Sequence, residues 1–209
     1  MQSVADAITV LRNSGVAILP TETVYALAAN AYDDVAVAKV FAYKDRDASK
    51  ALPVAYRALE DALRDVHCDA LSMQLAHRFM PGPLTLVLPV REDSMVVADV
   101  LAGLQTIAVR IPDHDLLQKI LAELDFPIVA TSANRSITHS TTSAQSALQS
   151  LSLCPGNDVA VVDDGECRLG RESTIVCVQD GEIRVLREGC VSIRELSALG
   201  PVRIVEVAR

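Results

Sequence analysis

Four short clusters of hydroxyl-bearing and charged residues could do chemistry in this chain of 209 residues. The first is Pro20-Thr21-Glu22-Thr23-Val24-Tyr25, which directly follows the apolar run Val16-Ala17-Ile18-Leu19. Hydroxyls and a carboxylate at the end of a buried strand occupy the place where α/β sheets usually bind ligands. An ordinary turn with a helix cap uses the same residue types, so position alone leaves both interpretations open.

The second cluster contains three cations within seven residues, Lys44, Arg46 and Lys50. Arg can pair with two phosphate oxygens at once, and Lys acts as a point charge, so the cluster is suited to binding phosphates. The alternative is a solvated loop in which the cations offset Asp45 and Asp47.

The third cluster joins Thr106 and Arg110 with Ser132 and Asn134. The period of two along a strand puts Thr106 and Arg110 on one face. A buried, unpaired Arg is very costly, so Arg110 needs an anionic partner, either a ligand carboxylate or a protein acid such as Glu22. Ser132 and Asn134 could donate hydrogen bonds to a ligand or satisfy a turn.

The fourth cluster is Arg171-Glu172-Ser173-Thr174 followed by Arg187-Glu188-Gly189, and it is weak alone. The sequence has no G-x-x-x-x-G-K-[ST] loop, no G-x-G-x-x-G turn and no G-x-S-x-G elbow. The residues themselves therefore predict only a cleft lined by hydroxyls and cations, for a small anionic or nucleotide ligand.

The elements that must position these clusters alternate between helix and strand. Apolar periodicity predicts helices over residues 4–11, 33–43, 58–79 with a break near 67–69, 113–124, 142–151 and 192–199. Apolar runs predict strands over 16–19, 52–55, 84–90, 105–111, 127–130, 159–162, 173–178 and 182–186. Asp180-Gly181 predicts a hairpin, and residues 131–134 are expected to form a loop. The pattern predicts an α/β fold with a mixed sheet flanked by helices, in one domain over 1–209.

Composition narrows the class of protein. The net charge of −8 lowers the expectation of a dedicated nucleic-acid binder, because such proteins neutralise phosphates with Lys and Arg. Five cysteines without a C-x-x-C pair argue against a disulfide framework and a zinc site. The N-terminus lacks a basic targeting segment, and no apolar run approaches the ~20 residues that cross a bilayer. We expect a cytoplasmic protein without a membrane segment.

Taken together, the clusters resemble the YrdC family of threonylcarbamoyl-AMP synthases from about Gly15 to Gly189. Pro20 to Leu27 is similar to the family's opening P-T-E-T-V-Y-G-L motif. Further motifs follow in the family's order: Lys44-x-Arg46 with Lys50, Pro81-Gly82-Pro83-Leu84-Thr85, Thr106 to His114, Ser132-Ala133-Asn134 and Ser173-Thr174. Each motif is weak alone, but six in order are specific.

The resemblance implies a twisted, concave sheet with a large basic-lined cavity, and a reaction that condenses L-threonine with bicarbonate and adenylylates the product with ATP. It implies L-threonine binding by Thr23, Arg110, Ser132 and Ser173. It implies ATP binding by Lys44, Arg46, Lys50, Thr106, Asn134 and Arg187. Mg²⁺ is expected with ATP, and catalysis is expected from positioning and electrostatics, chiefly by Lys44 and Arg46. The implied partners are tRNA and a downstream threonylcarbamoyl transferase complex.

The sequence departs from the family pattern at several positions. Ala26 replaces a Gly, Asp47 a Pro, Ala55 a common His, and Ile137 a Gly. Ala26 and the Arg187-Glu188-Gly189 ending are similar to the divergent YciO-like branch. The alternative functions are therefore a non-catalytic binder of RNA or nucleotide, and a small-molecule sensor or hydrolase using the same cavity.

Overall fold

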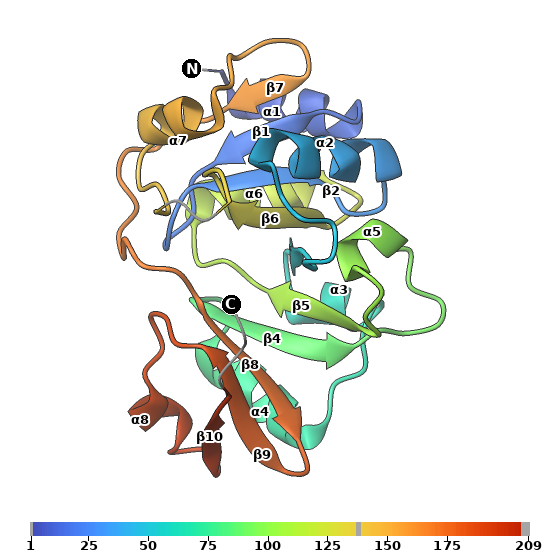
Figure 1. Cartoon of the computed structure of the whole chain (residues 1–209), viewed down its shortest axis with the longest axis vertical. Coiled ribbons are helices and arrows are strands. Elements are labelled where there is room, and N and C mark those ends of the chain that lie inside the picture. Colours follow the sequence, from blue (N-terminus) through green and yellow to red (C-terminus); the bar gives the residue numbers. More distant parts are fainter. Residues whose placement is uncertain (1, 137–138, 206–209) are drawn as a thin grey trace.

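One twisted sheet joins all ten strands of this computed structural model, in which residues 2–136 and 139–205 are described (Figure 1). The strands are β1 (Val16–Leu19), β2 (Ala26–Asn30), β3 (Pro53–Ala55), β4 (Leu84–Pro89), β5 (Thr106–Arg110), β6 (Ile128–Ser132), β7 (Val159–Val161), β8 (Thr174–Gln179), β9 (Glu182–Arg187) and β10 (Val202–Ile204). The helices are α1 (Val4–Arg12), α2 (Asp34–Lys44), α3 (Leu59–Ala62), α4 (Ala70–Phe79), α5 (Ala98–Leu101), α6 (Asp115–Glu123), α7 (Ala144–Leu151) and α8 (Ile193–Leu196).

The sheet is mixed, as the sequence predicts. Its strand order is β10-β9-β8-β4-β5-β3-β6-β2-β1-β7. Parallel pairs join β1 to β7, β3 to β5, β4 to β8 and β9 to β10, and the other neighbours are antiparallel. The α/β prediction is confirmed.

Helices cover both faces of the half of the sheet that contains β1 and β2 (Figure 1). Ala17 and Leu19 pack in the same apolar cluster as α1 and α6, whereas Val16 and Ile18 pack in the cluster that contains α2 and α7. Since successive strand residues point to opposite faces, β1 is apolar throughout because both of its faces are buried.

Local signals in the sequence explain several element boundaries. Asp33, the predicted start of this helix, is the N-cap of α2, because its side chain accepts hydrogen bonds from the backbone N–H groups of Val35 and Ala36. Asp180 and Gly181 both have positive φ, the backbone that a two-residue hairpin requires. The predicted hairpin between β8 and β9 is confirmed.

Other boundaries differ from the prediction. The helix expected over 58–79 with a break near 67–69 is two helices, α3 and α4, and the break between them is longer than predicted, over residues 63–69. Thr131 and Ser132 were expected in a loop but are the last residues of β6, because they pair with Leu27 and Ala26 of β2. The strand β2, the short helix α5 and the strand β10 were not predicted.

Among the described residues, no helix combines the length and the apolar character that crossing a bilayer requires.

Candidate functional site

A cavity of about 330 Å³ opens on the sheet where β3, β5 and β6 meet the segments that follow β1 and precede β8. Nine of the ten residues that were predicted to bind ligands line it. They are Thr23, Lys44, Lys50, Arg46, Arg110, Ser132, Asn134, Ser173 and Arg187. These residues are spread over more than half of the chain, and the fold brings them to one hollow.

Thr106 is the exception. It begins β5 and pairs with Pro89 of β4, two residues before the cavity-lining Ala108. Thr106 is not among the described residues that line the cavity. Its predicted contact with ATP therefore requires a ligand that extends past the hollow along β5.

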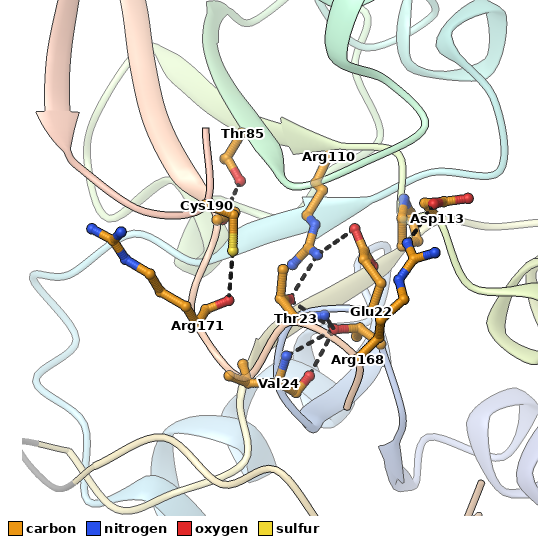
Figure 2. Close-up of polar contacts among 12 residues, drawn as sticks. Glu22, Thr23, Val24, Thr85, Arg110, Asp113, Arg168, Arg171 and Cys190 are labelled. Atoms are coloured by element: carbon orange, nitrogen blue, oxygen red, sulfur yellow. Dashed lines mark hydrogen bonds and ion pairs between the residues drawn. The ribbon is translucent and has the colours of Figure 1, made fainter. Parts of the chain in front are cut away.

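Arg110 lies at the end of β5, where it contacts the segment that follows β1 (Figure 2). Its Nη2 is 2.8 Å from Oε1 of Glu22 and donates a hydrogen bond to Thr23 Oγ1 at 2.7 Å. The Glu22 side chain is 1% exposed and that of Arg110 is 14% exposed. Of the two partners left open for Arg110, the structure contains the protein acid. A ligand carboxylate can still contact the guanidinium, because the Arg110 side chain lines the cavity and is partly exposed.

Thr21 holds the turn that carries Thr23. The hydroxyl of Thr21 donates to the backbone carbonyl of Val24 at 2.7 Å, and its oxygen accepts from the backbone N–H groups of Thr23 and Val24 at 3.0 and 3.2 Å. Both lone pairs of Thr21 are therefore used, and Thr23 Oγ1 lies 2.8 Å from the same oxygen. Thr23 Oγ1 accepts a hydrogen bond from Arg110 Nη2, which leaves its second lone pair for an N–H group of a ligand.

Lys44 lies at the C-terminal end of α2 and is buried. Its ammonium donates to the backbone carbonyl of Ser132 and, at 2.6 Å, to that of Asn134. Burial, and to a smaller extent the neighbouring Arg46, lowers the pKa of Lys44 to about 8, and Glu172 opposes the shift. Lys44 therefore holds the segment that carries Ser132 and Asn134, and it adds positive charge to the cavity wall.

Arg46 shapes the loop that follows α2. Its Nη2 donates to the carbonyl of Ala51 at 2.9 Å, and its Nε donates to that of Lys50 at 3.2 Å. Burial lowers the pKa of Arg46 from its ordinary value, with Asp47 acting in the opposite direction. The predicted basic cluster is thus a folded loop on the cavity wall, and the alternative of a fully solvated loop is wrong for Lys44 and Arg46.

Ser173, Arg187 and Glu172 form the opposite wall. Arg187 donates to the carbonyl of Ser173 at 2.9 Å and to its Oγ at 3.2 Å. Its Nη1 lies 2.7 Å from Glu172 Oε2, and Glu172 Oε1 accepts from Ser140 Oγ. Burial lowers the pKa of Arg187, with Glu172 opposing the shift. Ser173 Oγ lies 2.9 Å from Thr85 Oγ1.

The cavity is strongly basic although the chain is acidic. Its described lining holds five cations, Lys44, Arg46, Lys50, Arg110 and Arg187, against one carboxylate, Glu172. A concave, positively charged surface attracts anions. Within the described residues, no three His, Cys, Asp or Glu side chains gather into a metal-binding group. A Mg²⁺ ion bound mainly by ligand phosphates fits this wall, because Mg²⁺ commonly uses one or two carboxylates plus phosphate oxygens.

Five polar residues of the lining had no predicted ligand role: Thr21, Thr85, Thr131, Ser136 and Glu172. Thr85 interrupts the apolar pattern of a predicted strand. A lone hydroxyl on an otherwise apolar strand face is the signal that could have identified Thr85.

The departures from the family pattern lie close to the cavity. Ala26 and Ala55 both line it, so their small side chains leave space at the floor. Asp47 accepts a hydrogen bond from the backbone N–H of Ser49, and this turn replaces the rigidity of a proline. Ile137 lies outside the described residues.

Known proteins are similar to this chain in sequence and in fold. The Sua5/YciO/YrdC family, described as telomere recombination, matches residues 9–189. The threonylcarbamoyl-AMP synthases of Pyrococcus abyssi and Bacillus subtilis are 37% and 36% identical to the chain, over 198 and 204 residues. These alignments cover 93% and 96% of this chain, but 56% and 58% of the relatives.

A solved structure agrees with these relatives. The crystal structure of P. abyssi Sua5 complexed with L-threonine superposes with a TM-score of 0.88 at 34% identity, covering 96% of this chain and 58% of that one. The chain thus spans a little over half the length of the relatives it matches. The resemblance predicted from the motifs is confirmed, and the chain belongs to the Sua5/YciO/YrdC family.

Proposed function

We propose that this protein is an L-threonylcarbamoyladenylate synthase, which uses L-threonine, bicarbonate and ATP. The amino nitrogen of L-threonine bonds to the carbon of bicarbonate and water leaves. An oxygen of the resulting carbamate then bonds to the α-phosphorus of ATP, and the bond to pyrophosphate breaks. The single observation that carries the proposal is the basic cavity, in which nine of the ten motif residues meet.

The amino-acid half of the proposal rests on Arg110, Thr23, Ser132 and Ser173. Arg110 supplies a guanidinium for the carboxylate of L-threonine, since its side chain lines the cavity and is partly exposed. Thr23 keeps a lone pair beside the one that accepts from Arg110, and this suits the N–H of the substrate's amino group. The relative of known structure was solved with L-threonine, which supports this half.

The ATP half rests on Lys44, Arg46, Lys50, Asn134 and Arg187, with Thr106 farther along β5. Attack on the α-phosphate builds negative charge that fixed cations can stabilise. Lys44, Arg46 and Arg187 are each held by hydrogen bonds to backbone carbonyls, so they need little reorganisation when the charge develops.

Catalysis is proposed to come from positioning and electrostatics. The described lining contains no histidine or cysteine, and its hydroxyls lie beside no general base. Holding two reactants in register can supply several kcal/mol of rate acceleration, on the order of 7–11 in the best intramolecular models.

Further parts of the proposal extend beyond the cavity. The sheet that joins all the described strands supports one domain over 1–209. Mg²⁺ is proposed to arrive with ATP, supplying extra charge neutralisation at the phosphates. A cytoplasmic location, contact with tRNA and transfer to a downstream threonylcarbamoyl transferase complex follow from the same family assignment.

The competing proposal is a non-catalytic binder of RNA or nucleotide. The divergent positions Ala26 and Glu188 motivate it. The 36–37% identity to named synthases favours the enzyme instead. A binder predicts salt-sensitive affinity for RNA that L-threonine leaves unchanged.

Pyrophosphate release tests the proposal. The purified chain should release pyrophosphate from ATP only when L-threonine and bicarbonate are both present. Release that is indifferent to either substrate would contradict a synthase.

A further inference from the structure

Thr85 lies on the floor of the cavity beside Arg110. It belongs to β4 and is 2% exposed. Leu86 pairs with Val109 across β4 and β5, so the preceding residue Thr85 is the strand neighbour of Arg110. Both side chains line the cavity, and a strand holds a side chain more rigidly than a loop does.

Thr85 and Ser173 form a buried pair of hydroxyls. Their oxygens are 2.9 Å apart, although the residues are 88 positions apart in the chain. Ser173 Oγ also accepts a hydrogen bond from Arg187 Nη2 at 3.2 Å. Each hydroxyl has one hydrogen and two lone pairs, so the capacity of the pair can be counted.

The count leaves one donor hydrogen on one oxygen and at least one free lone pair on the other. If Thr85 donates to Ser173, both lone pairs of Ser173 are used and its hydrogen remains, while Thr85 keeps its lone pairs. If Ser173 donates instead, Thr85 keeps its hydrogen and Ser173 keeps one lone pair. In either arrangement, the remaining hydrogen has no acceptor in the described part of the chain.

This arrangement complements an alcohol better than a carboxylate. An alcohol can accept a hydrogen bond from one oxygen of the pair and donate one to the other. A carboxylate has no hydrogen to donate, so one of its oxygens would face a lone pair of the second hydroxyl. Arg110, the adjacent strand neighbour, is the better site for the carboxylate. On the other side of Thr85, Ile175 lines the cavity and offers an apolar surface to a methyl group.

We propose that Thr85, with Ser173, is the specificity-determining residue that recognises the side-chain hydroxyl of a β-hydroxy amino acid. The inference rests on the proposed function, because L-threonine is such an amino acid. A site built to hydrogen-bond a substrate hydroxyl rejects the isosteric analogue that lacks it, since its own polar groups would stay unpaired.

Calorimetric binding of L-threonine and the isosteric L-valine tests the inference, with and without a non-hydrolysable ATP analogue. The wild type should prefer L-threonine. Thr85→Val should lower that preference by about tenfold, chiefly by weakening L-threonine binding. Thr85→Ser keeps the hydroxyl and should retain the preference. Ser173→Ala removes the other half of the pair and serves as a second variant should Thr85→Val fail to fold.

The outcomes separate the inference from the function. A Thr85→Val protein that keeps the full preference for L-threonine would overturn the inference, while threonine-dependent pyrophosphate release would still support the synthase. An equal loss of affinity for L-threonine and L-valine would also overturn it, because Thr85 would then act on the common part of the substrate. A wild type that neither binds L-threonine nor releases pyrophosphate would overturn both.

Discussion

Glu22 and Arg110 form a buried ion pair at the edge of the cavity, with 2.8 Å between Glu22 Oε1 and Arg110 Nη2 (Figure 2). The Glu22 side chain is not part of the described cavity lining, whereas Arg110 is. Glu22 therefore affects the cavity only through Arg110. It balances the charge of Arg110 and restrains its guanidinium, which also contacts Thr23. A guanidinium that is already oriented can bind a ligand carboxylate with less loss of side-chain freedom.

Replacing Glu22 should weaken amino-acid binding without direct contact to the substrate. Glu22→Gln removes the charge that orients Arg110, so we expect the dissociation constant of L-threonine to rise about tenfold and the free energy of unfolding to fall by about 1–3 kcal/mol. Calorimetry and denaturant titration measure the two effects. Glu123→Gln, on the exposed end of α6, is the matched control and should change neither. Unaltered L-threonine affinity in Glu22→Gln would show that Arg110 needs no such support.

The lowered pKa of Lys44 predicts a pH dependence of ATP use. Burial and Arg46 bring this pKa to about 8, so the ammonium loses its proton as the pH rises through that value. The cavity then loses a positive charge, and kcat/KM for ATP should fall between about pH 7 and 9, because this ratio reports the free enzyme. Lys44→Arg stays charged over this range and should lose the inflection. An identical inflection in both proteins would assign it to another group, such as the substrate's amine.

Arg46 should contribute to ATP binding through its charge and through the loop that it holds. Arg46→Ala should weaken binding of a non-hydrolysable ATP analogue by about 1.5–3 kcal/mol, the value typical of a hydrogen bond to a charged group. Affinity for L-threonine should change much less. Arg46→Lys keeps a charge but lacks the fork that bonds both carbonyls, so its affinity for the ATP analogue should lie between those of the wild type and Arg46→Ala. Wild-type ATP affinity in Arg46→Ala would remove Arg46 from the site.

Replacing Arg110 should weaken the use of L-threonine and not that of ATP, the reverse of the effect expected for Arg46. Arg110→Ala should raise the KM for L-threonine by at least about tenfold, because the substrate carboxylate loses its cation, and it should leave the KM for ATP nearly unchanged. Steady-state kinetics with each substrate varied in turn measure both. A rise confined to ATP would place Arg110 at the phosphates.

Gly189 should be required for the wall that contains Ser173. A Cβ at this position would lie 2.2 Å from the carbonyl oxygen of Glu172 and 2.4 Å from the carbonyl carbon of Ser173. Gly189→Ala must therefore displace that backbone, and we expect a lower Tm together with a higher KM for L-threonine. Gly156 has open space around the same position and ordinary φ, so Gly156→Ala is the control that should leave both unchanged. If Gly189→Ala changed neither the Tm nor the KM for L-threonine, the backbone of this wall would move more easily than its packing indicates.

The sequence identifies the strands that carry the site, but not how their ends meet. The segment containing Thr23 follows β1, Arg110 ends β5, and Ser132 ends β6. Because β3 is parallel to β5 and antiparallel to β6, Arg110 is level with the beginning of β6, four residues before Ser132, so the rule for the carboxyl ends of parallel strands does not bring these two residues together. Ser173 precedes β8 and lies near Arg110 because β8 is parallel to β4 and β4 is antiparallel to β5.

Other features depend on long-range contacts that local patterns do not encode. The strand β2 is rich in alanine, which favours helices in isolation, and it is extended because it pairs with β1 and β6. Lys44 was predicted to contact phosphate, but its ammonium also holds carbonyls 88 and 90 positions away. The Thr85–Ser173 pair likewise exists only in the folded sheet.

Transfer of isotope-labelled bicarbonate carbon into the product tests the central claim most directly. With ATP and L-threonine, mass spectrometry should find the label in an adduct of threonine, the bicarbonate carbon and AMP, formed in step with pyrophosphate. Pyrophosphate without a labelled adduct, or no turnover at all in the presence of all three substrates, would contradict a synthase built on this cavity.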